Sequence, residues 1–234
     1  MQSSRFLQRV TRKLAVIARG CFQCKLDGFL NDVSGVIHIG ANLGQERDTY
    51  DGHGLRVLWI EPIPDVYEEL SKNLRGYPQQ IARRYLVTDT DGQEYQFFLA
   101  NNGGQSSSIL EMAEHTKLWP DVKYVDSIVM KGITLPTLLQ TENLQVQDYQ
   151  ALVLDVQGAE HLILKGAESL LRKFKYIKLE VPDFEAYKGC PTVHGLVGYL
   201  ASFGFREIAR SRFQKREAGC YYDIVFRRRW FRSG

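Results

Sequence analysis

From residue 35 onward, short apolar runs alternate with longer segments in which apolar residues recur every three to four positions. Short runs of this kind are typical of buried strands, whereas the longer period indicates helices with one buried face. The runs predict strands at Val36–Ile39, Val57–Ile60, Tyr85–Val87, Leu152–Leu154 and Tyr176–Val181. The periodic segments predict helices at Leu43–Tyr50, from near Pro64 to Gly76, from Ala159 to Phe174 and from near Pro191 to Gly204.

Four further strand-like runs complete the pattern. Glu94–Leu99 and Ser127–Leu135 flank a polar loop at 101–108, and Phe205–Ala209 and Tyr221–Phe226 are joined by a charged turn. Five βα units closed by a hairpin predict an α/β protein of the class I methyltransferase type. This Rossmann-like fold has a seven-stranded, mostly parallel sheet with a C-terminal antiparallel hairpin and helices on both faces. We expect a single domain over residues 27–234, with an insertion at about 90–135.

Residues 1–26 differ from the rest of the chain, because they contain six basic residues and no acid. The spacing of their apolar residues predicts a basic amphipathic helix, with one apolar face at Phe6, Leu7, Val10, Leu14 and Ile17. We expect this helix to pack on the edge of the domain. A membrane-surface helix, which would give peripheral membrane contact, and an organellar transit segment are the alternatives.

The charge of the chain is distributed unevenly. Its 30 basic residues include six in residues 1–26 and four in residues 227–234, so the body between them has 20 bases against all 27 acids. A groove for nucleic acid requires the opposite sign, so this balance disfavours an RNA or DNA partner. No apolar run approaches the roughly 18 residues of a membrane span, and no signal peptide is visible.

The four cysteines are too few for a disulfide scaffold. Cys21 and Cys24 form a single C-x-x-C pair, and a zinc site there would need two more ligands brought by the fold. We expect reduced thiols and a cytoplasmic protein.

The strongest chemical signal lies in the first two predicted strands. Val36–Ile39 leads into a turn with Gly40 and Gly44, and Glu61 follows the second strand. Glycine allows close approach of a ligand to the backbone, and an acid at the end of the neighbouring strand can bind a ribose diol. The Gly40-x-x-x-Gly44 spacing differs from the G-x-G-x-x-G of dinucleotide sites and favours S-adenosylmethionine over NAD.

Three motifs resemble the FkbM family of S-adenosylmethionine-dependent methyltransferases. They are H-I-G-A-N-L-G-Q at 38–45, I-E-P-I-P at 60–64, and L-D-V-Q-G-A-E at 154–160 followed by L-K-G-A at 164–167. The resemblance extends from about Val36 to Phe226. The chain departs from the expected pattern at His38, where many class I enzymes have an acid, and at Gln157, where the family often has Glu.

The resemblance implies S-adenosylmethionine as cofactor and methyl transfer to a hydroxyl of a saccharide, glycolipid or natural product. The acceptor is then a small molecule or a saccharide. Thr88 and Asp89 are placed where class I folds contact adenine. The expected cofactor-binding residues are His38, Gly40, Ala41, Asn42, Gly44, Gln45, Glu61, Pro62, Thr88, Asp89, Ser107, Asp155 and Val156.

Three carboxylates are candidates for catalysis because an alcohol is a poor nucleophile at neutral pH and benefits from a general base. Asp155 follows the fourth strand, and capping or contact with the cofactor's amine is its alternative role. Glu160 lies in a first helical turn, where the helix dipole also stabilises an acid. Glu180 lies on the fifth strand, where a solvated position is the alternative. No metal is expected, although a divalent cation bridging Asp155 and Glu180 is the lesser alternative.

Other readings stay open. They are an RNA or DNA methyltransferase, a binding module that keeps the fold without turnover, and an NAD-dependent oxidoreductase, which the missing middle glycine and the terminal hairpin disfavour. His115, His161 and His194 are expected to be surface or packing residues. Three aromatic residues near predicted loops either stack on a sugar face or pack in the core, namely Trp119, Tyr124 and Tyr187.

Overall fold

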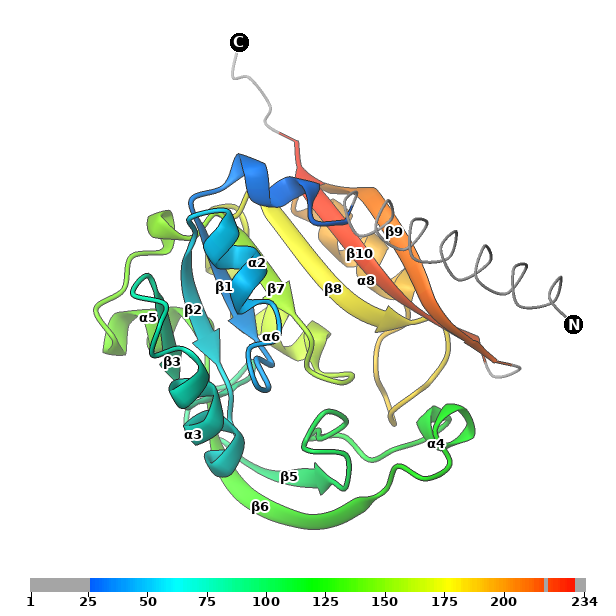
Figure 1. Ribbon diagram of the computed structural model, residues 1–234. Helices are drawn as coiled ribbons and strands as arrows, with labels where there is room; N and C mark the ends of the chain where they lie inside the picture. The colour runs from blue at the N-terminus through cyan, green and yellow to red at the C-terminus, as the bar shows by residue number, and fades with distance from the viewer. Residues whose placement is uncertain (1–25, 217–218, 230–234) are drawn as a thin grey trace, which may run out of the picture.

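A seven-stranded sheet forms the centre of the protein, with the strand order β3-β2-β1-β7-β8-β10-β9 (Figure 1). The computed structural model describes residues 26–216 and 219–229. The strands from β3 to β8 are parallel neighbours, whereas β10 is antiparallel to both β8 and β9. The predicted mostly parallel sheet with a C-terminal hairpin is therefore confirmed. The strands are β1 (Gly35–Ile39), β2 (Arg56–Ile60), β3 (Gln80–Arg83), β7 (Ala151–Leu154), β8 (Tyr176–Pro182), β9 (Phe205–Arg216) and β10 (Gly219–Arg228).

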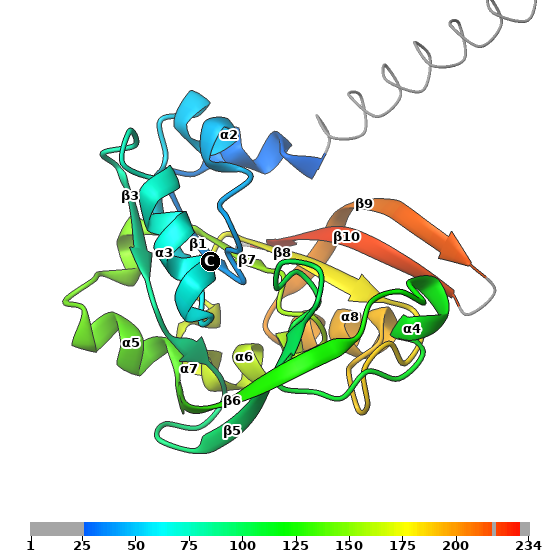
Figure 2. The same cartoon turned by 60° about the horizontal axis from the view of Figure 1, so that its bottom comes forward.

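Helices cover both faces of this sheet (Figure 2). One face is covered by η1 (Gly28–Asp32), α2 (Arg47–Gly52) and α3 (Pro64–Asn73). The other face is covered by α5 (Leu135–Thr141), η2 (Val146–Asp148), α6 (Glu160–Gly166), α7 (Glu168–Leu171) and α8 (Val193–Ser202).

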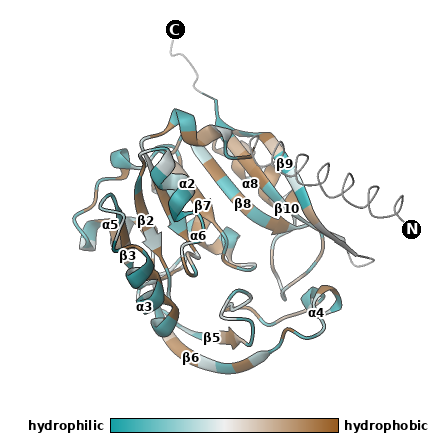
Figure 3. Cartoon of the chain, in the orientation of Figure 1, coloured by the Kyte–Doolittle hydropathy of each residue, from teal (hydrophilic) through white to brown (hydrophobic). Residues whose placement is uncertain are grey.

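Alternation of side chains along the strands divides the core into two halves. Successive strand residues point to opposite faces, so Ile37 and Ile39 pack with α5, α6 and α8, whereas Val36, Val57 and Trp59 pack with η1, α2 and α3. All five are at most 2% exposed. Figure 3 shows hydrophobic residues concentrated on the central strands and hydrophilic residues on α2 and α3. A sheet buried on both faces explains the continuous apolar runs in the sequence.

A second, three-stranded sheet lies beyond the carboxyl ends of β1, β2 and β8 (Figures 1 and 2). Its order is β4-β6-β5, formed by β4 (Leu86–Val87), β5 (Glu94–Ala100) and β6 (Tyr124–Ile133). Buried Ile63, Leu86 and Phe97 join this sheet to the start of α3. The short helix α4 (His115–Leu118) lies between β5 and β6 in the chain. The segment predicted as an insertion therefore builds a separate layer over the carboxyl edge of the main sheet.

The third strand was predicted in the wrong place. Tyr85–Val87 was expected there, but the main sheet contains Gln80–Arg83, and Leu86–Val87 pairs with β6 in the small sheet. The sequence Q-I-A-R is too polar to indicate a buried strand. It fits because Gln80 is buried and its side-chain oxygen accepts a hydrogen bond from Trp59 Nε1 at 2.9 Å.

Other boundaries differ for steric reasons. The first helix begins at Arg47 instead of Leu43, since Gly44 has a φ of +71° and interrupts helical geometry. The predicted helix Ala159–Phe174 is divided into α6 and α7 at Ala167. Helix α5 was not predicted, and β9 and β10 extend several residues beyond the predicted hairpin strands.

The predicted amphipathic helix of residues 1–26 and the Cys21–Cys24 pair fall almost entirely outside the described residues. Of the residues that are described, none belongs to a helix with the length and apolar character needed to cross a membrane.

Gly40 provides a test of the closest approach between β1 and β7. It has a φ of +84°, and a Cβ there would lie 1.8 Å from the carbonyl oxygen of Asp155. We expect Gly40→Ala to lower the free energy of unfolding by more than about 3 kcal/mol, since backbone must move. Gly54→Ala is the control, because Gly54 has a φ of +65° but open space around it. It should cost only about 1–2 kcal/mol.

Urea denaturation of both variants measures these differences. Equal destabilisation by the two substitutions would contradict the close approach of Gly40 to Asp155.

Candidate functional site

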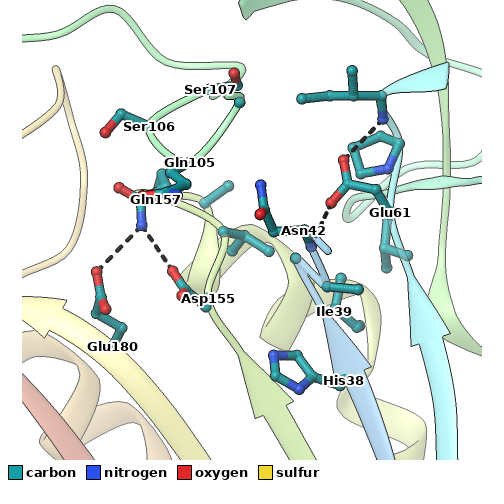
Figure 4. A pocket seen from close by; sticks show the side chains of 18 of the residues that line it. His38, Ile39, Asn42, Glu61, Gln105, Ser106, Ser107, Asp155, Gln157 and Glu180 are labelled. Atoms are coloured by element: carbon teal, nitrogen blue, oxygen red, sulfur yellow. Dashed lines mark hydrogen bonds between the residues drawn. The ribbon is translucent and has the colours of Figure 1, made fainter. Parts of the chain in front are cut away.

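A cavity of about 370 Å³ lies between the carboxyl edge of the main sheet and the small sheet. The turn after β1, the ends of β2 and β7, the strand β8, the loop 101–108, α4 and β9 all contribute to its lining. Figure 4 shows the carboxylate side chains converging on it from separate strands. The carboxyl edge of a parallel sheet is where ligands bind in open α/β folds.

The turn after β1 brings backbone close to the cavity. Gly40, Asn42 and Gly44 all have positive φ, at 84°, 44° and 71°. The amides of Gly40 and Ala41 donate to the carbonyl of Ile60 at 3.0 and 3.1 Å. Asn tolerates the left-handed region better than other non-glycine residues, so the G-x-N-x-G pattern encodes this turn.

Glu61 is held at the end of β2 by the backbone. Its two carboxylate oxygens accept hydrogen bonds from the amides of Asn42 and Ile63, at 2.8 and 3.0 Å. The side chain lines the cavity although the residue is only 4% exposed. Desolvation by burial raises the pKa of Glu61 to about 7, even though both hydrogen bonds favour the charged form.

Asp155 and Glu180 are joined by the side chain of Gln157 (Figure 4). Gln157 Nε2 donates to Asp155 at 2.7 Å and to Glu180 at 3.2 Å, and its Oε1 accepts from the hydroxyl of Tyr187 at 2.9 Å. Desolvation raises the pKa of Asp155 to about 6 and the pKa of Glu180 well above its ordinary value. The charge of Asp155 also raises the pKa of Glu180, while the charges of Asp223 and Glu46 raise the pKa of Asp155, so the pair favours a state with one shared proton.

The departure from Glu at position 157 has a physical reason. A third carboxylate between Asp155 and Glu180 would add like charge at a site that is already desolvated. The amide supplies two N–H donors instead, one for each carboxylate.

At position 38, where many class I enzymes have an acid, this chain has a buried and uncharged histidine ring. His38 is 5% exposed, stacks on Trp59 at 4.8 Å, and has its Nδ1 3.1 Å from the hydroxyl of Tyr50. Burial lowers the pKa of His38 to about 4, so the ring is uncharged at pH 7. Glu46, which was not predicted as a site residue, lines the same side of the cavity, and its charge acts to raise the pKa of His38.

The electrostatic character of the cavity is therefore acidic. Glu46, Glu61, Asp155 and Glu180 line it, and no Lys or Arg is present among the lining residues in the described ranges. Lys178 carries the nearby positive charge that lowers the pKa of Asp155, but it bonds to Asp27 at 3.3 Å. In the part of the chain that the structure describes, no group of three or more His, Cys, Asp or Glu residues is suited to a metal ion.

The loop 101–108 covers the cavity and is fixed at several points. Ser108 Oγ donates to the carbonyl of Gln157 at 2.8 Å, and Asn42 Nδ2 donates to the carbonyl of Gly103 at 3.2 Å. Ser107 Oγ accepts from the amide of Ala100 at 3.0 Å. These bonds connect the loop to both the β1 turn and the β7 turn.

Most predicted site residues are brought together by the fold. Of the predicted set, those that line the cavity are His38, Gly40, Ala41, Asn42, Gln45, Glu61, Pro62, Ser107, Asp155, Val156 and Glu180. Their roles toward a ligand stay predictions.

Gly44, Thr88, Asp89 and Glu160 do not line it. Gly44 is packed against Leu70, where a Cβ would lie 2.8 Å from a methyl carbon. Thr88 is fully buried, and Asp89 accepts a hydrogen bond from the hydroxyl of Tyr95 at 3.2 Å. The preceding residues Tyr85, Leu86 and Val87 line the cavity instead, because this segment belongs to the small sheet.

Glu160 has a structural position. It is 1% exposed, and its Oε1 accepts from the amides of Val156 and Gly158 at 3.2 and 3.3 Å, which ties the turn to the start of α6. Burial raises the pKa of Glu160 to about 7.

Several lining residues were missed. His115 was expected to be a surface or packing residue, but it lines the cavity together with Trp119 and Phe213. Phe97 and Ile109 also line it, from the insertion. The spacing of motifs could not reveal these positions, since they depend on how the insertion and hairpin fold over the sheet.

The strand order, with its antiparallel strands at the C-terminal end, is that of the class I methyltransferase fold. The chain belongs to the FkbM methyltransferase family, because the family model of the methyltransferase FkbM domain matches residues 38–207, well over half of its length. Among curated proteins, no significant match to the sequence was found.

Solved structures show the same fold at low identity. An uncharacterized protein from Listeria monocytogenes serotype 4b has a TM-score of 0.51 and 10% identity, covering 89% of this chain and 69% of its own. Magnesium protoporphyrin IX methyltransferase from Synechocystis PCC 6803, with bound SAH, has a TM-score of 0.50 and 11% identity, covering 95% of this chain and 82% of its own. The N-methyltransferase NodS from Bradyrhizobium japonicum WM9, in complex with S-adenosyl-L-homocysteine, has a TM-score of 0.50 and 10% identity, covering 90% of this chain and 86% of its own.

The raised pKa of Glu160 predicts a pH dependence of stability. Between about pH 4.5 and 7 the unfolded chain releases this proton while the folded protein keeps it, so the free energy of unfolding falls as pH rises. Glu160→Gln removes the titrating group and keeps an oxygen acceptor. From pH 4.5 to pH 8, the free energy of unfolding of Glu160→Gln should fall by about 3 kcal/mol less than that of wild type.

Urea denaturation at the two pH values measures the decline. Glu69→Gln is the control, because the Glu69 side chain is 56% exposed and should follow wild type. Parallel declines in all three proteins would contradict burial of an ionisable Glu160.

Proposed function

We propose that the protein transfers a methyl group from S-adenosylmethionine to a hydroxyl oxygen of a saccharide, glycolipid or natural product. The observation that carries the proposal is the cavity with four carboxylates and, among its described lining residues, no Lys or Arg. S-adenosylmethionine supplies an activated methyl group on a positively charged sulfonium, and an acidic cavity favours a cation.

The chain's own residues suggest how the cofactor is held. Glu61 has its two oxygens fixed by backbone amides at the end of β2, where ribose hydroxyls donate to an acid in this fold class. Gly40 lets the backbone approach, and Ile63 and Val87 supply apolar lining beside Glu61. With neutral His38 at the usual acidic position, Glu46 is proposed to contact the methionine amine.

Asp155 and Glu180 are proposed to manage the acceptor's proton. The pair keeps one proton near neutral pH, which leaves one ionised oxygen able to accept a proton from a hydroxyl. Gln157 fixes both side chains, so the acceptor oxygen is oriented as well as activated. Orientation of this kind contributes roughly 7–11 kcal/mol to rate acceleration.

The negative charge of the cavity lining disfavours the alternatives that use NAD or act on RNA or DNA. The diphosphate of NAD and the backbone of RNA or DNA are polyanions, and the described lining of this cavity has no base to pair with them. A protein–nucleic acid interface also requires many cationic contacts.

Calorimetry with S-adenosylmethionine tests the assignment of Glu61. We expect Glu61→Ala to weaken binding by about 30-fold or more, since it removes the side chain proposed to accept from the ribose hydroxyls. Glu69→Ala, on the exposed face of α3, should bind as wild type does. Equal affinities for wild type and Glu61→Ala would overturn the pocket assignment, and binding of NADH instead would replace the function.

Transfer of label from methyl-tritiated S-adenosylmethionine tests Asp155. Incubation with cell extract, followed by separation of glycan, lipid and nucleic acid fractions, identifies the labelled class. We expect Asp155→Asn to lower transfer by about 10²–10⁴ while cofactor affinity changes less than tenfold. Loss of cofactor binding would assign Asp155 to the methionine amine, and absence of transfer by wild type would support a binding module.

A further inference from the structure

The cavity has a second end that the cofactor assignments do not use. The cavity runs across the carboxyl edge of the sheet, from Glu61 beside β2 to Phe213 on β9. These strands are five places apart in the sheet order, and adjacent strands are separated by roughly 4.8 Å. Asp155 and Glu180 lie between the two ends, on β7 and β8.

Aromatic rings form this second end. His115 lies 4.7 Å from Trp119 and 5.0 Å from Tyr187, measured between ring centroids, and Phe213 lies 5.8 Å from Tyr221. Of these rings, His115, Trp119 and Phe213 line the cavity itself. They come from the insertion and the hairpin, outside the segments that form the cofactor end.

His115 is fixed in place but incompletely satisfied. Its Nδ1 is 3.0 Å from the hydroxyl of Tyr221, and its backbone amide donates to the carbonyl of Ala186 at 3.1 Å. The residue is only 2% exposed, and its Nε2 has no hydrogen-bonding partner among the described residues. Buried polar atoms are nearly always paired, so an atom without a partner on a residue that lines the cavity indicates a ligand group.

The charge of the His115 ring limits which chemical group of a ligand can pair with it. Burial lowers the pKa of His115 to about 4, so its ring is neutral at pH 7 and offers one donor or one acceptor at Nε2. A hydroxyl matches either tautomer. A carboxylate or phosphate is disfavoured by Glu180 and Asp155, which lie beside this end.

We propose that the ring-lined end of the cavity binds an uncharged, polyhydroxylated acceptor, with Nε2 of His115 hydrogen-bonded to a hydroxyl that is not methylated. This proposal rests on the proposed function. Trp119 and Phe213 pack against the acceptor ring, while Tyr221 acts as a positioning residue that fixes the His115 ring. The methylated hydroxyl lies toward Asp155, between this end and the cofactor.

The test uses the full-length protein saturated with S-adenosylhomocysteine. The probes are methyl glycosides of glucose, galactose, mannose and rhamnose, each of the first three paired with its uronate. Saturation-transfer NMR measures binding, and the long-range ¹H–¹⁵N spectrum of the histidine rings reports the state of His115 Nε2. We expect a neutral glycoside to bind at least tenfold more tightly than its uronate and to shift the Nε2 resonance.

Three variants assign the contact. His115→Phe keeps a ring but removes Nε2, and it should weaken the preferred glycoside more than tenfold. His115→Gln, which retains an amide near the same position, should recover part of that loss. Tyr221→Phe should raise the KM for the acceptor more than it lowers kcat. Cofactor affinity by calorimetry should stay within twofold of wild type in all three variants, and circular dichroism checks their folding.

The outcomes separate the two proposals. Failure of wild type to bind S-adenosylmethionine would sink the proposed function. Cofactor binding combined with a preference for uronates, equal glycoside affinity in His115→Phe, or no binding of any neutral glycoside by wild type would overturn the inference alone.

Discussion

Desolvation of carboxylates at one edge of the sheet is the constraint on which the site depends. Glu61, Asp155 and Glu180 each come from a different parallel strand and face the same cavity. Their carboxyl groups accept hydrogen bonds from backbone amides and from the amide of Gln157, and the charge of Lys178 acts on Asp155. Ionising these carboxyl groups costs free energy when the cavity is empty. A bound cation would stabilise their charged form.

The half of the fold that is proposed to bind the cofactor could be predicted from the sequence. Apolar runs marked β1, β2, β7 and β8 because these strands are buried on both faces. The turn glycines and Glu61 follow directly from those strands, so local order in the chain was sufficient to bring them together. The strand β3 was missed because the partners of its buried Gln80, the indole of Trp59 and the carbonyl of Arg47, are distant in the sequence.

The half that is proposed to bind the acceptor could not be predicted in the same way. His115, in the insertion, is held by a hydrogen bond to Tyr221, which lies 106 residues further along the chain. No local periodicity encodes a contact of that separation. Thr88 and Asp89 illustrate the same limit, since the segment containing them leaves the main sheet and pairs with β6. Sequence pattern locates elements well, but it does not show which surface of an insertion closes a cavity.

The two ends of the cavity are encoded in separate stretches of chain. The end proposed for the cofactor is lined mainly by residues 38–63, whereas His115, Trp119 and Phe213 come from the insertion and the terminal hairpin. With the proposed roles, substitutions in these outer segments would change the acceptor and leave the residues that hold the methyl donor intact. Such modularity makes the architecture well suited to diversification of its products.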